Sequence, residues 1–484
     1  MNTMRPITPV KPALARNFSL VLSLVMLAVL SACTLGPDYK GPPDSAPHAV
    51  QSGRFVRADD AAMRKAAPLN EWWLGLADPE LNELVRHALD ANPNLNIARA
   101  RLQQSRAALN LEQANGMPST GASALAGHAR LPPFTDGGSA TSVNLYSVGF
   151  DASWEVDIFG GHKRSVQAAQ ASAQAAEATL ADVQVSLAAE VANAYINLRD
   201  RQQRIALGEQ SVGMQEEMIR LTEQRLARGT ASSLDLIRLQ NQLDATRADI
   251  VPLRADLESY LNQLATLAGE EPGALDAQLN TASPLPLPPA QVQVGDPASL
   301  LRHRPDIRAA ERTLAADTAK IGQAEAARYP SMKLFGVIGL GGTHPSDLTK
   351  LDDFSTVLAP MLSWNFLDFG RNTARVNQAE EVRNEAEMKY RQTVLEALRD
   401  AEDSLSRFRH GRVTVATLAR TKASADRALT LVQQRYRAGT TTLIDVLDTT
   451  RQQVSAEQNL LQAEANLTRS FVAIQKALGL GWSS

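Results

Sequence analysis

Residues 191–228 carry the sequence VANAYINLRDRQQRIALGEQSVGMQEEMIRLTEQRLAR, and this stretch decides the fold. An apolar residue recurs at every seventh position of the stretch: Val191, Leu198, Ile205, Val212, Ile219 and Leu226. An apolar period of seven residues, kept over several turns, predicts a left-handed coiled coil. No proline occurs from 161 to 228, so we expect a single helix of about 68 residues, roughly 100 Å long at ~1.5 Å per residue. A helix of that length needs partner helices of similar length.

The long stretch occurs twice in the chain. The sequence WEVDIFG at 154–160 matches WNFLDFG at 364–370, which lies 210 positions later. The same offset separates QRLARGT at 224–230 from QRYRAGT at 434–440. A repeat of this length indicates duplication of a whole structural unit rather than a solenoid of short repeats.

The repeats and the proline-rich stretches between them predict a domain map. A first unit at 69–271 and a second at 298–484 are joined by a proline-rich linker at 272–297. Each unit is expected to hold two strands and two long helices. We expect these elements at about 119–131, 144–157, 161–228 and 231–269 in the first unit, and at about 331–341, 354–368, 370–438 and 441–479 in the second.

The clearest strand is the stretch 144–157, in which apolar and polar residues alternate strictly from Tyr146 to Asp157. A period of two fits a membrane β-barrel strand with an apolar face toward lipid and a polar face toward the lumen. It also fits a sheet that covers a soluble core. Tyr146 and Trp154 lie near the two ends of the stretch, where aromatic residues of membrane strands gather at the interface, and this favours the membrane interpretation.

The first 32 residues have the pattern of a secretory signal peptide, with basic residues Arg5, Lys11 and Arg16 before an apolar region at 18–30. The sequence LSAC at 30–33 resembles a bacterial lipobox, which implies cleavage before Cys33 and acylation of that residue. A buried structural cysteine is the alternative. Cys33 is the single cysteine of the chain, which excludes disulfides and cysteine-based metal sites. Thr34, rather than Asp, follows it, and the lipoprotein sorting rule then favours the outer membrane.

Residues 33–68 are rich in Pro, Gly and Ala, and we expect them to form an extended tether after the acylated residue.

Composition and motifs exclude several classes of function. The net charge is −3, and no basic arm is present, so no nucleic-acid partner is expected. The chain carries no G-x-S-x-G, H-E-x-x-H or P-loop motif. Its seven histidines are scattered singly. We therefore expect no enzyme activity, no cofactor and no metal site.

The chain resembles the outer-membrane factors of tripartite efflux systems, the TolC/OprM/NodT type. The resemblance is carried by the lipobox, the duplication, the WEVDIFG junction, HRPDI at 303–307, and RYRAGT with LIDVLD at 435–448. The resemblance covers essentially the whole mature chain. It implies a mainly α fold with membrane β structure: a homotrimeric α/β-barrel, in which long coiled-coil helices form a periplasmic α-barrel. Four strands per chain would join a shared outer-membrane β-barrel. Four strands cannot close a barrel alone, since the smallest have about eight, which also requires oligomerisation.

The function implied by the resemblance is a passive exit duct of an RND-type efflux pump for drugs or other small toxic compounds. The implied partners are a periplasmic adaptor, an inner-membrane pump and outer-membrane lipid, with the chain anchored at Cys33 and its helices in the periplasm. One alternative is the exit channel of a type I protein secretion system. A second is a periplasmic coiled-coil lipoprotein without a pore.

The resemblance also implies functional residues at the two helix-hairpin turns. The adaptor is expected to dock on the tips, at Arg225, Arg228, Gly229, Thr230, Ala438, Gly439 and Thr440. Asp445 and Asp448 match aspartates that ring the closed aperture in the resembled family. Three copies would place six carboxylates around one axis, where like charges raise some of their pKa values.

Helix capping is the alternative role for these acids, because acidic residues in a first turn complement the helix dipole. Asp445 has Asp235 as its counterpart in the first unit, whereas the counterpart of Asp448 is Arg238. Thr441 stands where the TolC branch has an arginine that joins neighbouring helices. Arg435, Tyr436 and Arg437 are available for the closing contacts instead.

Overall fold

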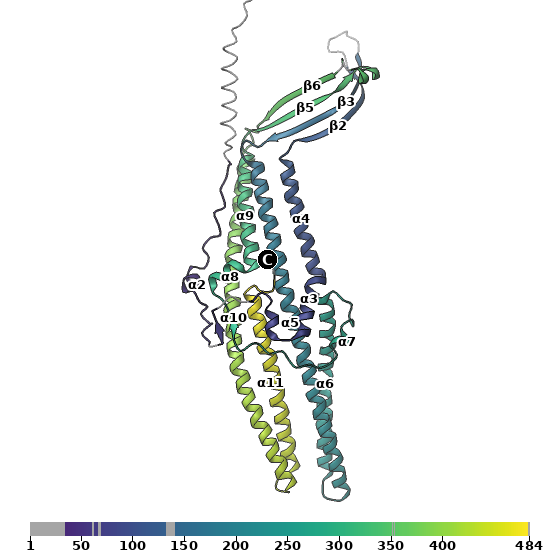
Figure 1. Ribbon diagram of the computed structural model, residues 1–484, viewed down its shortest axis with the longest axis vertical. Coiled ribbons are helices and arrows are strands. Elements are labelled where there is room, and N and C mark those ends of the chain that lie inside the picture. Colours follow the sequence, from purple (N-terminus) through teal and green to yellow (C-terminus); the bar gives the residue numbers. More distant parts are fainter. Residues whose placement is uncertain are drawn as a thin grey trace, which may run out of the picture. The chain divides into compact units, whose positions relative to one another are not determined.

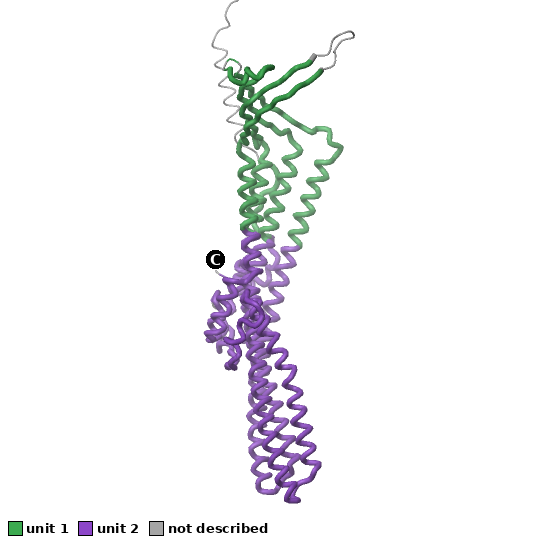
Figure 2. Tube along the Cα trace, turned by 90° about the vertical axis from the view of Figure 1, so that its right-hand side faces the viewer, with its two compact units in different colours: residues 1–42, 103–174, 311–388 green, residues 43–102, 175–310, 389–484 purple. Residues whose placement is uncertain are grey.

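The computed structural model describes residues 34–60, 62–65, 69–131, 141–350, 352 and 354–482. The expected signal peptide and Cys33 lie outside the described residues. The backbone divides into two compact units, one of residues 1–42, 103–174 and 311–388 and the other of residues 43–102, 175–310 and 389–484 (Figure 2). The long helices contribute residues to both units.

The first unit contains an antiparallel sheet of four strands in the order β2-β3-β5-β6 (Figure 1). The strands are β2 Ser119–Leu131, β3 Thr141–Val156, β5 Ser331–Gly342 and β6 Phe354–Ser363. β3 and β5 pair with Phe150 opposite Ile338. The two repeats of the sequence therefore meet in the middle of one sheet, and each supplies one edge strand.

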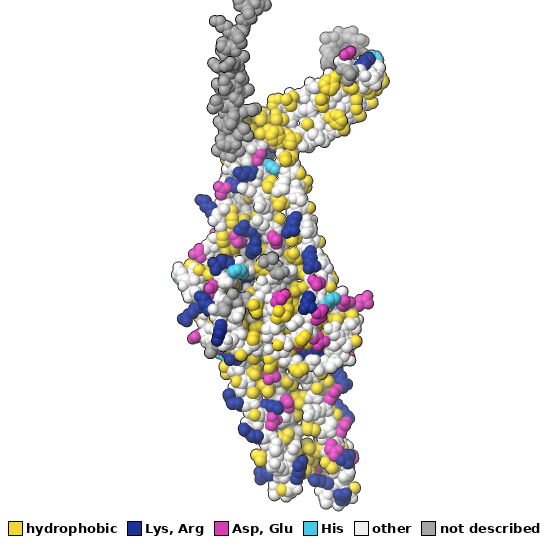
Figure 3. Space-filling view, in the orientation of Figure 1, with side chains coloured by type: hydrophobic (Ala, Val, Ile, Leu, Met, Phe, Trp, Pro, Cys, Tyr) yellow, Lys and Arg dark blue, Asp and Glu magenta, His cyan; other side chains and the backbone are white. Residues whose placement is uncertain are grey.

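Apolar side chains on one face of this sheet remain exposed. Phe150 is 66% exposed, and its neighbours on the same face, Val148, Ile338 and Leu358, are also exposed. Figure 3 shows hydrophobic side chains at the surface of the sheet. The polar partner Asp151 points to the opposite face, because successive strand residues alternate. The alternation from Tyr146 to Val156 thus places the apolar side chains of β3 on one face, which no described residue covers.

The strand β6 is an edge strand, and it tolerates Pro360 opposite Leu334 for that reason. It ends at Ser363 rather than at the expected residue 368. Ser363 pairs with Ser331, the first residue of β5, and the preceding Pro330 has no N–H to continue the ladder. Trp364 follows the strand, and its indole N–H donates to the Arg328 carbonyl at 3.1 Å.

Two long helix hairpins and several shorter helices complete the chain (Figure 1). The helices of the first repeat are α3 Pro79–Ala91, α4 Pro93–Asn115, α5 Gly161–Ala227 and α6 Ser233–Ala268. Those of the second are α8 Pro297–His303, α9 Pro305–Ala326, α10 Arg371–Arg437 and α11 Leu443–Ala477. α5 and α10 each have 67 residues. No described helix has the length and apolar character needed to cross a membrane.

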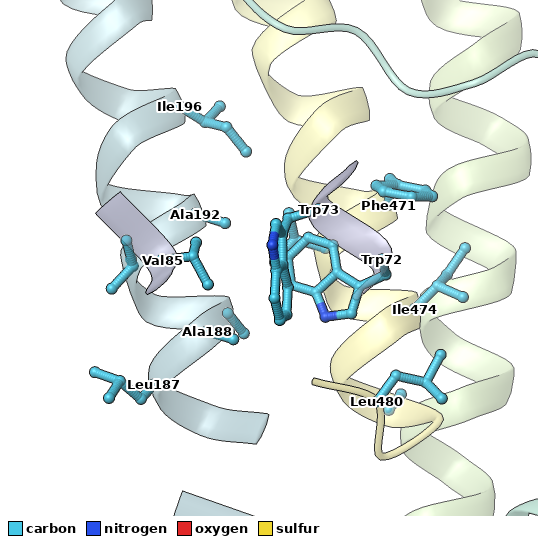
Figure 4. Packing of buried hydrophobic residues seen from close by; sticks show 14 of the residues in the cluster. Trp72, Trp73, Val85, Leu187, Ala188, Ala192, Ile196, Phe471, Ile474 and Leu480 are labelled. Atoms are coloured by element: carbon cyan, nitrogen blue, oxygen red, sulfur yellow. The ribbon is translucent and has the colours of Figure 1, made fainter. Parts of the chain in front are cut away.

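The second unit has an extended apolar core. Trp72 and Trp73, in the short helix η1 Trp72–Leu76, pack edge to face with ring centroids 5.7 Å apart. Figure 4 shows them between α5, which presents Ala188 and Ala192, and α11, where Phe471 lies against Trp72. Small alanines on α5 leave room for the indole rings, because a packed interior has few voids.

A buried arginine joins the connecting segments of the second unit to α5. The Arg199 side chain is fully buried and donates to Glu80 of α3 and, at 2.8 Å, to the Thr281 carbonyl. Its guanidinium also lies 4.7 Å from the centroid of the Tyr195 ring. A buried cation needs such partners, so these contacts hold α3 and the chain around residue 281 against the long helix.

The structure revises the expected tether at 33–68 and the expected linker at 272–297. Phe55 is only 2% exposed, and β1 Met63–Arg64 pairs in parallel with β4 Val292–Gln293. The tether also contains the helix α2 Pro47–Ser52, and the linker contains α7 Asp276–Leu279. The described parts of both segments are packed, because each supplies backbone groups that pair with the other and apolar side chains that reach the core.

Candidate functional site at the hairpin tips

The turns that end α5 and α10 have the same geometry. In the first, Gly229 has a φ of 73°, and the backbone N–H and hydroxyl of Thr230 both donate to the Arg225 carbonyl, at 2.9 and 3.1 Å. The second turn repeats both distances around Gly439, which has a φ of 74°. A left-handed residue after the helix favours glycine, and an added Cβ would meet no atom within 4 Å. The backbone conformation, rather than crowding, therefore requires glycine here.

Asp445 caps the N-terminus of α11. Its carboxylate accepts hydrogen bonds from the Thr442 hydroxyl at 2.6 Å, the Thr441 hydroxyl at 2.7 Å and the Thr442 backbone N–H at 3.0 Å. These donors, chiefly the Thr442 hydroxyl, lower the pKa of Asp445 to about 2. Asp235 forms the same capping box with Ser232 at the start of α6. Capping, the alternative raised by the sequence, thus accounts for the contacts of the Asp445 side chain.

Asp448 lies one turn further along α11 and has no part in the capping box. Its side chain is 58% exposed, and its carboxylate lies 3.4 Å from the Arg451 guanidinium. Such an exposed pair one helical turn apart holds a side chain weakly. Of the two aspartates, Asp448 is the one whose carboxylate is free to face another molecule or another copy of the chain.

Arg225 and Tyr436 connect the two hairpins near their tips. The Arg225 guanidinium donates to the Tyr436 hydroxyl and lies 5.0 Å from the centroid of its ring. Arg225 stands in the last turn of α5 and Tyr436 in the last turn of α10. The structure therefore joins a residue expected at the adaptor-docking tip to one expected at the aperture. Arg435 instead adds a positive charge that helps to lower the pKa of Asp445, while Arg228, Ala438 and Thr440 are exposed.

A groove of about 1040 Å³ lies between the two hairpins, beside the Arg225–Tyr436 contact. Met214 and Met218 of α5 line it together with Val446 of α11. Ser211, which is 1% exposed, also lines the groove, and its hydroxyl has no hydrogen-bond partner among the described residues. Sequence reasoning missed this groove, because its walls come from four helices that are far apart in the chain.

Charged pairs link the two helices within each hairpin. In the first hairpin Glu216 pairs with Arg247 at 2.6 Å. In the second, Asp426 of α10 accepts from the Gln453 side chain of α11 at 2.9 Å, and Lys422 of α10 lies 3.8 Å from the Glu457 carboxylate of α11. The pKa of Asp426 is lowered, chiefly by the hydrogen bond from Gln453. Each hairpin is thus linked internally, and the Arg225–Tyr436 contact lies between the hairpins.

Within the described part of the chain, no group of three or more His, Cys, Asp or Glu residues is placed to hold a metal ion.

Comparisons with known proteins give consistent matches along the chain. A family model described as outer membrane efflux protein matches residues 84–270 and 297–480, which are the two copies of the duplicated unit. Nodulation protein T of Rhizobium leguminosarum bv. viciae is 30% identical over 473 residues, which cover 97% of this chain and 94% of the relative. The toluene efflux pump outer membrane protein TtgF of Pseudomonas putida is 30% identical over 476 residues, covering 96% and 97%.

The solved structure of the outer-membrane channel OprN is 34% identical to this chain. The match covers 93% of this chain and 100% of that one, with a TM-score of 0.88.

Proposed function

The chain belongs to the outer membrane efflux protein family, and from this premise we propose that three copies of it form the exit duct of a tripartite efflux pump of the RND type. The duct passively conducts drugs or other small toxic compounds across the outer membrane. It receives them from a periplasmic adaptor and an inner-membrane pump. No cofactor is required, because the pump supplies the energy.

Family membership confirms the resemblance to outer-membrane factors that the sequence predicts. The fold class is confirmed as well: a mainly helical chain that contributes four strands and long helices to a channel of the outer membrane. The chain is therefore an outer-membrane efflux protein. The passive mode of transport, the RND pump and the adaptor are parts of the proposal.

The observation that carries the proposal is the apolar face of the four-stranded sheet, which no described residue covers, together with its two edges, β2 and β6, which pair with no further described strand. In lipid, unpaired backbone groups cost several kcal/mol each. Pairing β2 of one copy with β6 of the next removes both edges and, in three copies, closes a ring of twelve strands. The face that bears Phe150 and Leu358 would then contact lipid, and the face that bears Asp151 would line the lumen.

We assign the membrane anchor to Cys33, which would carry the acyl chains of a bacterial lipoprotein. A single acyl chain anchors a protein weakly, whereas several chains together with a membrane barrel anchor it stably. Thr34, the next residue, supports sorting to the outer membrane.

We place the periplasmic aperture at the second hairpin tip, with Asp448 as the principal carboxylate and Asp445 beside it. The exposed Asp448 side chain supports this role, while the Asp445 carboxylate also caps α11. Tyr436 would help to close the aperture through its contact with Arg225. The adaptor would dock on the exposed turn residues around Gly229 and Gly439.

Two measurements test the duct. Purified protein should migrate as a trimer in mild detergent, and it should give single-channel conductance in planar lipid bilayers. A monomer without conductance would support the non-pore lipoprotein instead. Deleting the gene should raise sensitivity to small toxic compounds; loss of protein secretion with unchanged sensitivity would assign the chain to type I secretion.

A further inference from the structure

The segment of residues 34–39, directly after the expected lipidation site, is bound to the first unit by a buried arginine. Arg164, in the first turn of α5, is 3% exposed. Its Nε donates to the Leu35 carbonyl and its Nη2 to the Gly36 carbonyl, both at 2.9 Å. Its Nη1 lies 2.9 Å from the Asp38 carboxylate. One planar guanidinium thus binds three successive parts of the segment, as its fixed set of donors permits.

Further contacts hold both ends of the segment. The Leu35 backbone N–H donates to the Phe159 carbonyl at 3.2 Å, in the junction between β3 and α5. The Lys163 ammonium donates to the Thr34 hydroxyl at 3.2 Å. At the other end, the Tyr39 hydroxyl donates to Glu311 of α9 at 3.2 Å. The segment therefore crosses from the strand–helix junction to α9 in a defined conformation.

Glycines make room for the segment. A Cβ on Gly322, in the interior of α9, would lie 2.6 Å from the Leu35 carbonyl oxygen and 2.8 Å from the Arg164 Nε. A Cβ on Gly36, which has a φ of 81°, would lie 2.3 Å from the Gly322 Cα. Glycine inside a helix destabilises the helix relative to alanine. Close passage of the N-terminal segment gives a physical reason for glycine at position 322.

The second repeat serves as an internal comparison, because it follows the linker at 272–297 and not the mature N-terminus. At the position equivalent to Arg164 the second copy has Ala374, and at that of Lys163 it has Thr373. In the first copy the helix position equivalent to Gly322 is Asn110, 212 residues earlier. Lys163, Arg164 and Gly322 all contact the segment. At the equivalent positions of the other copy they are replaced by Thr373, Ala374 and Asn110.

We propose that the strand–helix junction at 160–164 and Gly322 form a docking site for the mature N-terminal segment 34–39, with Arg164 as its positioning residue. The acylated end of the chain is then held at the end of the membrane sheet instead of on a free tether. A free flexible tether of 36 residues would reach roughly 30–36 Å. A docked segment instead fixes Thr34, the residue bonded to residue 33, beside Lys163 and the strand–helix junction. The consequence for the lipid rests on the proposed anchor at Cys33, whereas the docking itself does not.

Arg164→Ala tests the docking in the full-length trimer. For hydrogen exchange, the signal region 1–33 is replaced by a cleavable signal without a lipobox, so that the peptide 34–42 is released without acyl chains. Within this peptide, the variant should raise the exchange rate of the Leu35 amide, whose N–H donates to the Phe159 carbonyl, at least tenfold, and trypsin should cut faster after Lys40. Arg375→Ala is the matched control, since Arg375 lies in the same region of the second copy and donates to Asn372 of its own helix. Equal protection of the peptide in Arg164→Ala and wild type would overturn the proposal.

Gly322→Ala provides a second test that keeps the helix intact, since alanine strengthens a helix. Its Cβ should displace the Leu35 carbonyl and raise exchange of the same peptide. Unchanged exchange in this variant would also overturn the docking.

Labelled palmitate on the native lipoprotein separates the anchor from the docking. If the chain takes up no palmitate but the segment 34–39 is protected, the anchor at Cys33 is refuted and the docking site is supported. A palmitoylated chain in which trypsin cuts wild type as fast as Arg164→Ala would retain the anchor and overturn the docking site.

Discussion

The contact between Arg225 and Tyr436 should bias the duct toward its closed state. Tyr436→Phe keeps the ring that the guanidinium covers at 5.0 Å but removes the hydroxyl that accepts its hydrogen bond. A net hydrogen bond stabilises by about 0.5–1.5 kcal/mol. Arg225 is exposed, so we take the lower limit, about 0.5 kcal/mol per chain. Three equivalent contacts then contribute about 1.5 kcal/mol, which is close to a tenfold change in an equilibrium constant.

Single-channel recording in planar bilayers measures this change. The ratio of open to closed time should rise roughly tenfold in Tyr436→Phe, and further in Tyr436→Ala, which also loses the cation–π contact of about 0.5–1 kcal/mol at an exposed site. Arg228→Ala, an exposed arginine in the same turn, is the control and should leave the ratio unchanged. An unchanged ratio in both Tyr436 variants, with the trimer intact, would refute a closing role for the contact.

Four further outcomes are expected. Cys33→Ser should abolish incorporation of labelled palmitate while some trimer stays in the membrane, and unchanged labelling would contradict the anchor. Phe150→Arg should cost about 2–4 kcal/mol per chain if it faces lipid at mid-membrane depth, measured by trimer assembly; Asp151→Arg should be tolerated, and equal tolerance would argue against the barrel. Asp448→Ala combined with Asp445→Ala should abolish block of the channel by multivalent cations from the periplasmic side without disturbing assembly, and persistent block would place the constriction elsewhere. Because the pKa of Asp445 is lowered to about 2, its stabilisation of the α11 cap should be fully present above pH 3.8 and lost as the pH falls through about 2. Circular dichroism should show this acid-dependent fall in helicity in the wild type but not in Asp445→Asn.

The duplication distinguishes the two aspartates proposed for the periplasmic aperture. Asp235 and Asp445 occupy equivalent positions and form equivalent capping boxes, as the comparison of the two repeats suggested for Asp445. Asp448 has Arg238 at the equivalent position of the first repeat, and its side chain takes no part in the capping box. Sequence comparison alone could identify this difference, because a capping box is defined by residues three apart.

Much of the fold followed from local patterns. The seven-residue period from Val191 to Leu226 predicted a helix at 161–228, and the structure places α5 at Gly161–Ala227. The strand predicted at 144–157 from its alternation corresponds to β3 Thr141–Val156, which ends one residue earlier. Each pattern relates residues that lie only a few positions apart. Over such distances the backbone geometry of a helix or a strand decides which side chains share a face. The repeat then showed that each pattern occurs twice.

The sequence by itself determined the long helices, the strands, the glycine turns and the duplication, since each depends on neighbours a few residues apart. The tertiary structure alone decided the contacts between distant residues. Composition suggested an extended tether at 33–68, yet Arg164 binds Leu35 across 129 positions, and β1 pairs with β4 from the linker. Arg225 and Tyr436 are 211 positions apart. Such pairs form only when folded helices and strands bring matching donors and acceptors together. A sequence pattern of two or seven residues carries no information about partners more than a hundred positions apart.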